Sequence, residues 1–512
     1  MIRNAARGIV YICFVFAVIA AMFTGTAFAA EATVQLSLEE AISIALEQSF
    51  AIKSLMLSLS QAEQGYLSAK RRYWTNMDLS LSLPQWNERI SEVQVANALP
   101  VYNSRGTLRY RGRLNINQPL PTGGTFSLVS DGYQSEESNY FVDTDTTVKR
   151  KDFVSTVGLR FNQPLFTYNR LKNSLDRAEL NYETRSLSYS RGELDVIYSV
   201  TSSFFSLYRS TRSWEIAKES LAQQEEQYNL AKLKFEAGLI PEVESLRTEV
   251  NLASAQSRVM DAESAMESQR EAFKQTLGLP LTDNIGVRPD IDYVHFEVDL
   301  DKAVQLGLSN RTEIREQEIS ITLSEMSVIE TDARSEVRAD LSASYDFSGY
   351  SNQKLPLSTS PVDLFNSSWD DLTRRPGNRG VTLTVSLPVW DWGVNKAEVA
   401  SARAGLKRSQ LQLDEVKKDI VLSVTDAVRQ LRSAENSLIV LQKSQEVAER
   451  MYDISLERFN NGEITSLELA DDQQNLSNAK MSFLGAYISY KLAVADLKRK
   501  TRYDFELNVP LQ

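Results

Sequence analysis

The chain has 512 residues and carries 56 Lys and Arg against 67 Asp and Glu, which gives a formal net charge of −11. An acidic chain without a basic stripe is not typical of nucleic-acid binding, so we expect no nucleic-acid partner. The sequence holds one cysteine, Cys13, and one histidine, His295, which leaves little for metal or nucleophile chemistry. The composition therefore predicts no metal, no cofactor, no catalytic residue and a protein that is not an enzyme.

The first thirty residues predict a secretory signal peptide. Two arginines precede a continuous apolar run at residues 9–23, and Ala27 and Ala29 fit a small-x-small cleavage site. Cleavage near Ala30 or Glu31 removes both arginines and the cysteine, so the net charge moves from −11 to −13. No later segment holds about 18 consecutive apolar residues, so no transmembrane helix is expected after the signal. An uncleaved anchor is the alternative.

The rest of the chain is an internal duplication. Repeats of this kind determine the fold, so they are identified before other features. Three collinear pairs of segments show it: residues 36–46 match 298–308 at an offset of 262, residues 159–174 match 383–398 at an offset of 224, and Gly238 matches Gly462, also at 224. The fall from 262 to 224 means that the first half carries about 38 extra residues between its opening helix and its second matching segment.

Both halves follow the same expected order of helix, β-rich region, long helix, glycine hinge and last helix. The expected helices are 39–73, 170–235 and 242–277 in the first half, and 299–336, 393–459 and 466–500 in the second. We expect five segments: a signal peptide at 1–30, a first repeat at 31–280, a linker at 281–298, a second repeat at 299–500 and a tail at 501–512.

The β-rich regions alternate apolar and polar residues with period two, as residues 381–387 do with Val, Thr, Leu, Thr, Val, Ser and Leu. One apolar face and one polar face fit a half-buried sheet, and they equally fit a barrel wall between lipid and water. The signal peptide and the aromatic residues at strand ends favour the barrel. Two polar stretches, 133–151 and 351–379, are expected to be surface loops.

The last helix has a coiled-coil seam in which apolar residues step by three and four. Its members are Leu476, Ala479, Phe483, Tyr487, Tyr490, Val494 and Leu497. At 1.5 Å per residue the long helices span about 100 Å, and a hairpin of that length has little core of its own. We therefore expect copies of the chain to associate side by side.

This pattern resembles the TolC family of outer-membrane efflux and secretion ducts over nearly the whole mature chain. The resemblance rests on the duplicated opening helix, on "QPLF" at 163–166 and "LPVW" at 387–390, on the paired hinges, and on "LGLP" at 277–280. It implies a mainly α chain with a β-barrel part. Long helical hairpins would form a periplasmic α-barrel, and a homotrimer would share an outer-membrane β-barrel with about four strands per chain.

The extra 38 residues leave the strand number of the first half open. A chain that enters and leaves a barrel on the same side needs an even number of strands, so the first half has two long strands or four. The family implies two per half, which gives twelve per trimer. The surplus would then form an accessory hairpin.

The resemblance implies that the hinges are the periplasmic tips that meet a membrane-fusion adaptor, which connects the duct to an inner-membrane transporter. The tip residues are Phe235, Gly238, Leu239, Phe459, Gly462, Glu463 and Ile464. Glycine suits a tight reversal because it tolerates positive φ. The alternative is that the hinges only cap helices. Some family members hold a basic latch at the place of Ile464, so that latch is absent here.

Acidic residues past the hinges are expected to line the narrowest part of the duct. By the resemblance these are Glu468 and Asp471, with Asp472 beside them, and Glu244 after the first hinge. Around a threefold axis they would repel, raise one another's pKa and attract cations. A position near a helix start also stabilises acids, so part of the cluster is explained by capping.

The sequence thus predicts the passive exit duct of a tripartite efflux or type I secretion system, set in outer-membrane lipid with a long periplasmic extension. A periplasmic coiled-coil adaptor or structural spacer is the alternative, and the alternating strands with aromatic ends argue against it. A secreted enzyme is the weakest of the three readings, because no catalytic constellation is recognisable.

Overall fold

The computed structural model describes residues 34–94, 99–289, 295–351 and 355–511. The expected signal peptide lies outside the described residues. Two compact units make up the described chain. The first is built from the stretches up to Leu57, Ser188–Thr312 and from Val416 onward, and the second from Ser58–Leu187 and Glu313–Glu415.

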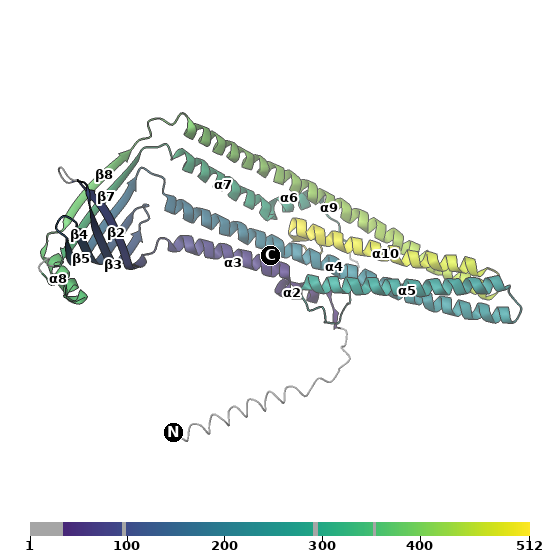
Figure 1. Ribbon diagram of the computed structural model, residues 1–512. Coiled ribbons are helices and arrows are strands. Elements are labelled where there is room, and N and C mark those ends of the chain that lie inside the picture. Colours follow the sequence, from purple (N-terminus) through teal and green to yellow (C-terminus); the bar gives the residue numbers. More distant parts are fainter. Residues whose placement is uncertain (1–33, 95–98, 290–294, 352–354, 512) are drawn as a thin grey trace, which may run out of the picture. The chain divides into compact units, whose positions relative to one another are not determined.

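Helices dominate the chain (Figure 1). They are α2 (Leu38–Gln48), α3 (Phe50–Arg71), α4 (Arg170–Glu236), α5 (Glu242–Leu277), α6 (Leu300–Asn310), α7 (Thr312–Asp332), α8 (Pro361–Arg374), α9 (Val394–Asn460) and α10 (Ser466–Thr501). The repeat is visible in their lengths, because α4 and α9 both have 67 residues and α5 and α10 both have 36. The predicted bounds of these four helices agree with the structure to within one residue.

The opening helix of each half is broken in two, where the sequence predicted one helix. In the first half the break falls at Ser49, whose backbone is extended and whose hydroxyl accepts from the N–H of Ile52 at 3.3 Å. Gly278 at the end of α5 packs directly against this break, since a Cβ on it would lie 2.4 Å from the carbonyl oxygen of Gln48. In the second half the break falls at Arg311.

The main sheet has six antiparallel strands, which corrects the expectation of about four per chain. In spatial order they are β2 (Asn76–Val93), β3 (Val101–Pro119), β4 (Thr125–Phe141), β5 (Thr146–Leu165), β7 (Arg338–Tyr350) and β8 (Asn378–Ser386). The surplus residues of the first half therefore form two full strands in register with the others. Two small pairings complete the described strands: β1 (Val34–Leu36) with β6 (Ile285–Val287), and β9 (Tyr503–Asp504) with β10 (Val509–Pro510).

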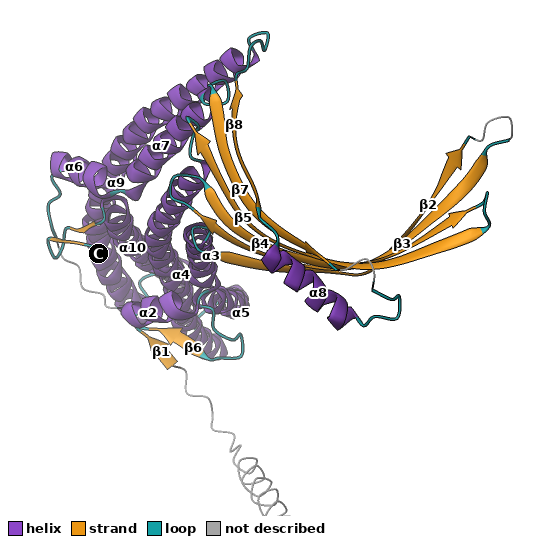
Figure 2. Ribbon diagram, turned by 90° about the vertical axis from the view of Figure 1, so that its left-hand side faces the viewer, coloured by secondary structure: helices purple, strands orange, loops and turns teal. Residues whose placement is uncertain are grey.

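The sheet is curved (Figure 2), and its register gives it one mainly apolar face and one polar face. The cross-strand row Ile116, Leu128, Leu159 and Tyr345 runs along the apolar face, and the row Arg113, Asp131, Thr156 and Ser348 runs along the polar face. Helix α8 covers part of the apolar face: Phe153 meets Phe365 edge-on, and the hydroxyl of Ser368 donates to the carbonyl of Gly349 at 2.9 Å. The alternation predicted from sequence is therefore the alternation of the two sheet faces.

The two stretches expected to be loops are largely regular. Residues 133–151 continue β4 and β5 and leave only a turn at 142–145. Cross-strand ion pairs hold this polar part in the ladder, such as Arg105 with Glu137 at 2.7 Å and Lys151 with Glu136 at 3.3 Å. Residues 351–379 contain α8 and the start of β8. Polarity alone misled the prediction, because it does not separate a loop from a strand with charged neighbours.

Among the described helices, no single one is long and apolar enough to cross a membrane. Helices α2 and α3, taken as one span with a bend of 42°, meet the length and composition of a crossing segment.

Candidate functional site

The two glycine hinges lie in the first unit, and each closes a helix with the same backbone turn. After α4, the N–H of Gly238 donates to the carbonyl of Phe235 and the N–H of Leu239 to that of Lys234, both at 2.8 Å. After α9, Gly462 donates to Phe459 at 3.0 Å and Glu463 to Arg458 at 2.8 Å. This pair of bonds is the Schellman motif, which satisfies the last carbonyls of a helix.

Glycine is required at both hinges because of the backbone conformation, and not because a side chain would lack room. Gly238 has φ +71° and Gly462 has φ +79°, in the left-handed region that other L residues rarely adopt. No described atom lies within 4 Å of the place where a Cβ would stand on either residue. A side chain would therefore fit, but the turn would be strained.

The second hinge has its own apolar core. Phe459 is 8% exposed and Leu469 is fully buried, and they pack with Ala448, Tyr452 and Leu476. Ile464, at the place of the absent latch, packs against the same cluster. Burial raises the pKa of Tyr452. The Phe459 side chain thus supports the hinge from inside.

The first hinge is far more open. Phe235 is 40% exposed and Leu239 is 73% exposed. The two hinges lie side by side, because the Nζ of Lys234 stands 4.9 Å from the ring centre of Phe459. Together they line a pocket of about 490 Å³, with Lys234, Leu239 and Glu244 on one side and Gly462, Ile464 and Ser466 on the other.

The carboxylate of Glu468 caps its own helix. It accepts from the N–H of Thr465 at 2.8 Å, and the Thr465 hydroxyl accepts from the N–H of Glu468 at 3.3 Å, which completes a capping box. The Thr465 backbone and hydroxyl hold the pKa of Glu468 below its ordinary value. In the single chain, capping lowers the pKa that crowding in a trimer was expected to raise.

The other three predicted acids have different surroundings. Glu244 reaches across to the second hinge, where it accepts from the Ser466 hydroxyl at 2.7 Å, and it also pairs with Arg247 at 3.1 Å. Asp472 accepts from the Ser455 hydroxyl at 2.6 Å. Asp471 is exposed and makes no polar contact with any residue that the structure describes.

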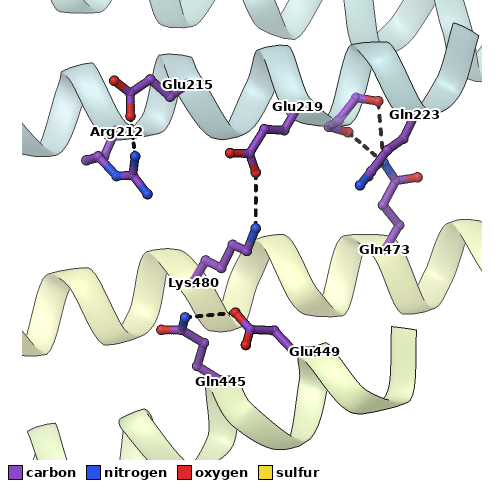
Figure 3. Close-up of polar contacts among 9 residues, drawn as sticks. Arg212, Glu215, Glu219, Gln223, Gln445, Glu449, Gln473 and Lys480 are labelled. Carbon is purple, nitrogen blue, oxygen red and sulfur yellow. Dashed lines mark hydrogen bonds and ion pairs between the residues drawn. The ribbon is translucent and has the colours of Figure 1, made fainter. Parts of the chain in front are cut away.

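Behind the hinges, α4 and α10 share a cluster of polar contacts around the buried Gln473, which was not predicted from the sequence (Figure 3). Gln473 of α10 donates to Gln223 at 2.6 Å and to the hydroxyl of Ser220 at 3.2 Å, and Gln224 donates to its oxygen at 2.5 Å. Lys480 reaches Glu219 on α4 at 3.0 Å. The signal was present, because Gln473 stands three residues before Leu476 and so continues the seam of α10. A polar residue in such a seam fixes helix register.

Known proteins resemble the chain at the level of both sequence and fold. The family model described as outer membrane efflux protein matches residues 129–279 and 303–501. Nodulation protein T of Rhizobium leguminosarum bv. trifolii is 21% identical over 324 residues, which is 63% of this chain. The chain spans 66% of the length of that relative, slightly less than two thirds.

Two solved outer membrane channels share the fold. The Campylobacter jejuni CmeC channel aligns with a TM-score of 0.67 at 16% identity, over 93% of this chain and 86% of that one. The Neisseria gonorrhoeae MtrE channel in its open state aligns with a TM-score of 0.62 at 15% identity, over 91% and 88%. At this level of identity the two alignments establish the fold.

The duplicated helical hairpins, the paired hinges and the alternating sheet are the architecture of an outer-membrane channel protein. The chain belongs to the outer membrane efflux protein family, since the family model covers well over half of it. Its location is the outer membrane, with a helical extension into the periplasm. This membership decides against a periplasmic spacer.

Proposed function

We propose that this protein is the passive exit duct of a tripartite efflux or type I secretion system and works as a homotrimer without a cofactor. The observation that carries the proposal is the pair of hinges, which lie side by side and leave Leu239 and Glu463 exposed. Three copies would present six such turns, enough for a ring of adaptor molecules. The energy for export would come from an inner-membrane transporter.

Unpartnered apolar seams on the helices support the trimer. Along the first hinge and α5, exposed apolar residues recur at Leu239, Val243, Leu246 and Val250; along α9 they recur at Val440, Val447, Met451 and Ile454. Both sets step by three, four or seven residues, as a coiled-coil seam does. Water-exposed seams of this length favour association, and a neighbouring copy offers the complementary seam.

For docking, the exposed members of the predicted tip are the natural contacts. These are Phe235, Gly238, Leu239, Gly462 and Glu463, while Phe459 and Ile464 hold the second hinge in shape. Export in cells tests this assignment. Gly462→Pro removes the turn, and we expect it to abolish pump-dependent export while trimers remain. Gly462→Asn, which tolerates left-handed backbone, is the matched control and should export. Normal export by the proline variant would count against docking at this hinge.

For the constriction, we propose that Asp471 provides the leading charge, with Glu468, Asp472 and Glu244 around it. Asp471 is exposed and has no described polar partner, so its charge is available to ions. Acids gathered around an axis attract cations and are neutralised by divalent ions.

Single-channel conductance of the purified protein in a planar bilayer is the test. We expect a small, cation-selective conductance that millimolar divalent cations block. Glu468→Ala combined with Asp471→Ala should raise the conductance and abolish the block. Ser455→Ala, which removes the partner of Asp472 without removing a charge, should leave the block intact. Unchanged conductance in the double variant would place the gate elsewhere.

A further inference from the structure

The main sheet ends in two open edges. Within the residues that the structure describes, β2 pairs only with β3 and β8 pairs only with β7. Every described side chain of both edge strands is exposed. An unpaired strand edge cannot face hydrocarbon, because its N–H and C=O groups find no partners there. In the outer membrane both edges therefore need a partner strand.

We propose that β2 of one copy pairs with β8 of the next, so that three chains of six strands close one barrel of eighteen strands. This closure rests on the homotrimer proposed above, and it adds which strands join one copy to the next. Barrel diameter grows roughly linearly with strand number, so this barrel would be about one and a half times as wide as the twelve-stranded barrel expected from the family resemblance.

Strand direction fits this closure. Each strand of the sheet is antiparallel to its neighbours from β2 through to β8. With six strands, β2 and β8 run in opposite directions. Copies related by rotation about the barrel axis therefore meet with antiparallel edges, and the alternation continues around the ring.

The two faces also fit. On β2, Leu79 stands opposite Leu114 on the apolar face, whereas Ser80 stands opposite Arg113 on the polar face. On β8, Leu383 stands opposite Leu341 on the apolar face. Opposite residues of paired strands share a face. A β2–β8 ladder that pairs Ser80 with a polar position of β8 therefore keeps the apolar face and the polar face continuous from one copy to the next.

The part of β2 before its bulge is close to β8 in length. A bulge interrupts β2 between Ser82 and Gln85, and it contains Pro84, which has no N–H to donate. Seven residues, Asn76–Ser82, precede the bulge in regular register with β3. Strand β8 has nine residues, enough to cover them. The rest of β2, Gln85–Val93, extends past the stretch that β8 covers.

The hairpin of β2 and β3 is part of the wall and not an accessory. Strand β3 pairs with β4 in unbroken register from Ser104↔Tyr140 to Pro119↔Thr125. Arg111 and Asp131 add a two-bond ion pair across these strands, at 2.8 and 3.0 Å. A twelve-stranded barrel would need β4 as its edge, and this whole ladder would have to separate.

Cysteine cross-linking tests the closure, because Cys13 in the expected signal is the chain's sole cysteine. The full-length protein carries Ser80→Cys together with Thr382→Cys, Thr384→Cys or Ser386→Cys, three positions on the polar face of β8 that cover registers two residues apart. Mild oxidation should convert most of one of these variants into disulfide-linked dimers and trimers on non-reducing gels. Ser80→Cys with Leu383→Cys places the thiols on opposite faces and should stay unlinked.

Two outcomes overturn the proposal in different ways. Native mass measurement of the unmodified protein comes first: if it is not a trimer, the proposed assembly fails and the closure fails with it. If it is a trimer and no β2–β8 pair cross-links, the closure alone is wrong. Linkage between Ser127→Cys on β4 and Thr382→Cys on β8 would instead establish a twelve-stranded barrel with β2 and β3 outside it.

Discussion

Gly238 and Gly462 end their helices with the same two backbone hydrogen bonds, yet the aromatic residue three positions earlier is exposed in the first hinge and buried in the second. The helix that follows differs as well. It begins at Pro241 with no side-chain cap after the first hinge, and at Thr465 with a full capping box after the second. The same turn is therefore set in two different surroundings.

The difference shows what a duplicated sequence fixes. The turn needs only a glycine and the carbonyls of the preceding helix, so it survives changes in its neighbours. The packing depends on side chains that differ between the copies: Ser245 occupies the place that corresponds to Leu469, and Gln224 the place that corresponds to Ala448. The second hinge consequently has an apolar core. The first hinge contacts that core through Lys234, whose Nζ lies over the ring of Phe459.

The largest expected effect comes from removing that core. Leu469→Ala deletes a fully buried side chain and should destabilise the second hinge by about 2–5 kcal/mol. Ser245→Ala, its counterpart in the first hinge, should change stability by less than about 0.5 kcal/mol. Hydrogen exchange of residues 448–476 measures the local opening. Equal effects of the two changes would mean that the hinges are not differently packed.

The glycines come next, and here the hinges should behave alike. Gly238→Ala and Gly462→Ala each force alanine into left-handed backbone, at a cost of about 1–2 kcal/mol. Gly485→Ala is the control: this glycine lies within α10 with open space around it, so the change should stabilise the helix by about 1 kcal/mol. Hydrogen exchange of the two turns is the readout. A much larger cost at one hinge would reveal a contact that only that hinge makes.

A smaller effect tests the bond that joins the hinges. Ser466→Ala removes the hydroxyl that donates to Glu244, and the expected coupling between the two residues is about 1 kcal/mol in a double-mutant cycle with Glu244→Ala. Arg247→Ala removes only the neighbouring ion pair on the same helix and should cost about 0.3–0.5 kcal/mol. A coupling near zero would show that the hinges open independently.

Much of the fold could be predicted from the sequence because its signals are periodic. The long helices and both hinges followed from apolar spacing and from Gly238 and Gly462, and the sheet faces followed from alternation. The strand number did not, because the 38 surplus residues are compatible with an accessory hairpin or with two wall strands. The unbroken register of β3 with β4 is what favours two wall strands.

The site was less accessible to sequence reasoning, because side-chain partners are set by packing. The acids near the hinges were found by position, but nothing local to Glu244 indicates that Ser466, on another helix, is its partner. The break at Ser49 was missed for a similar reason. It is formed where Gly278, far along the chain, approaches the backbone.

The smallest effect is electrostatic and concerns the second hinge alone. Thr465→Val keeps the shape of the capping residue and removes its hydroxyl, so the pKa of Glu468 should rise toward its ordinary value. A lowered pKa in the folded hinge means that the carboxylate stabilises the hinge fully above the ordinary glutamate pKa. That contribution is lost as the pH falls through the lowered value. Carboxyl ¹³C shifts of the labelled protein follow the titration, and Ser455→Ala, which alters only the partner of Asp472, should leave the titration of Glu468 where it is. If Thr465→Val also leaves it unmoved, the backbone N–H of residue 465 alone holds the pKa of Glu468 down, and the hydroxyl contributes nothing to it.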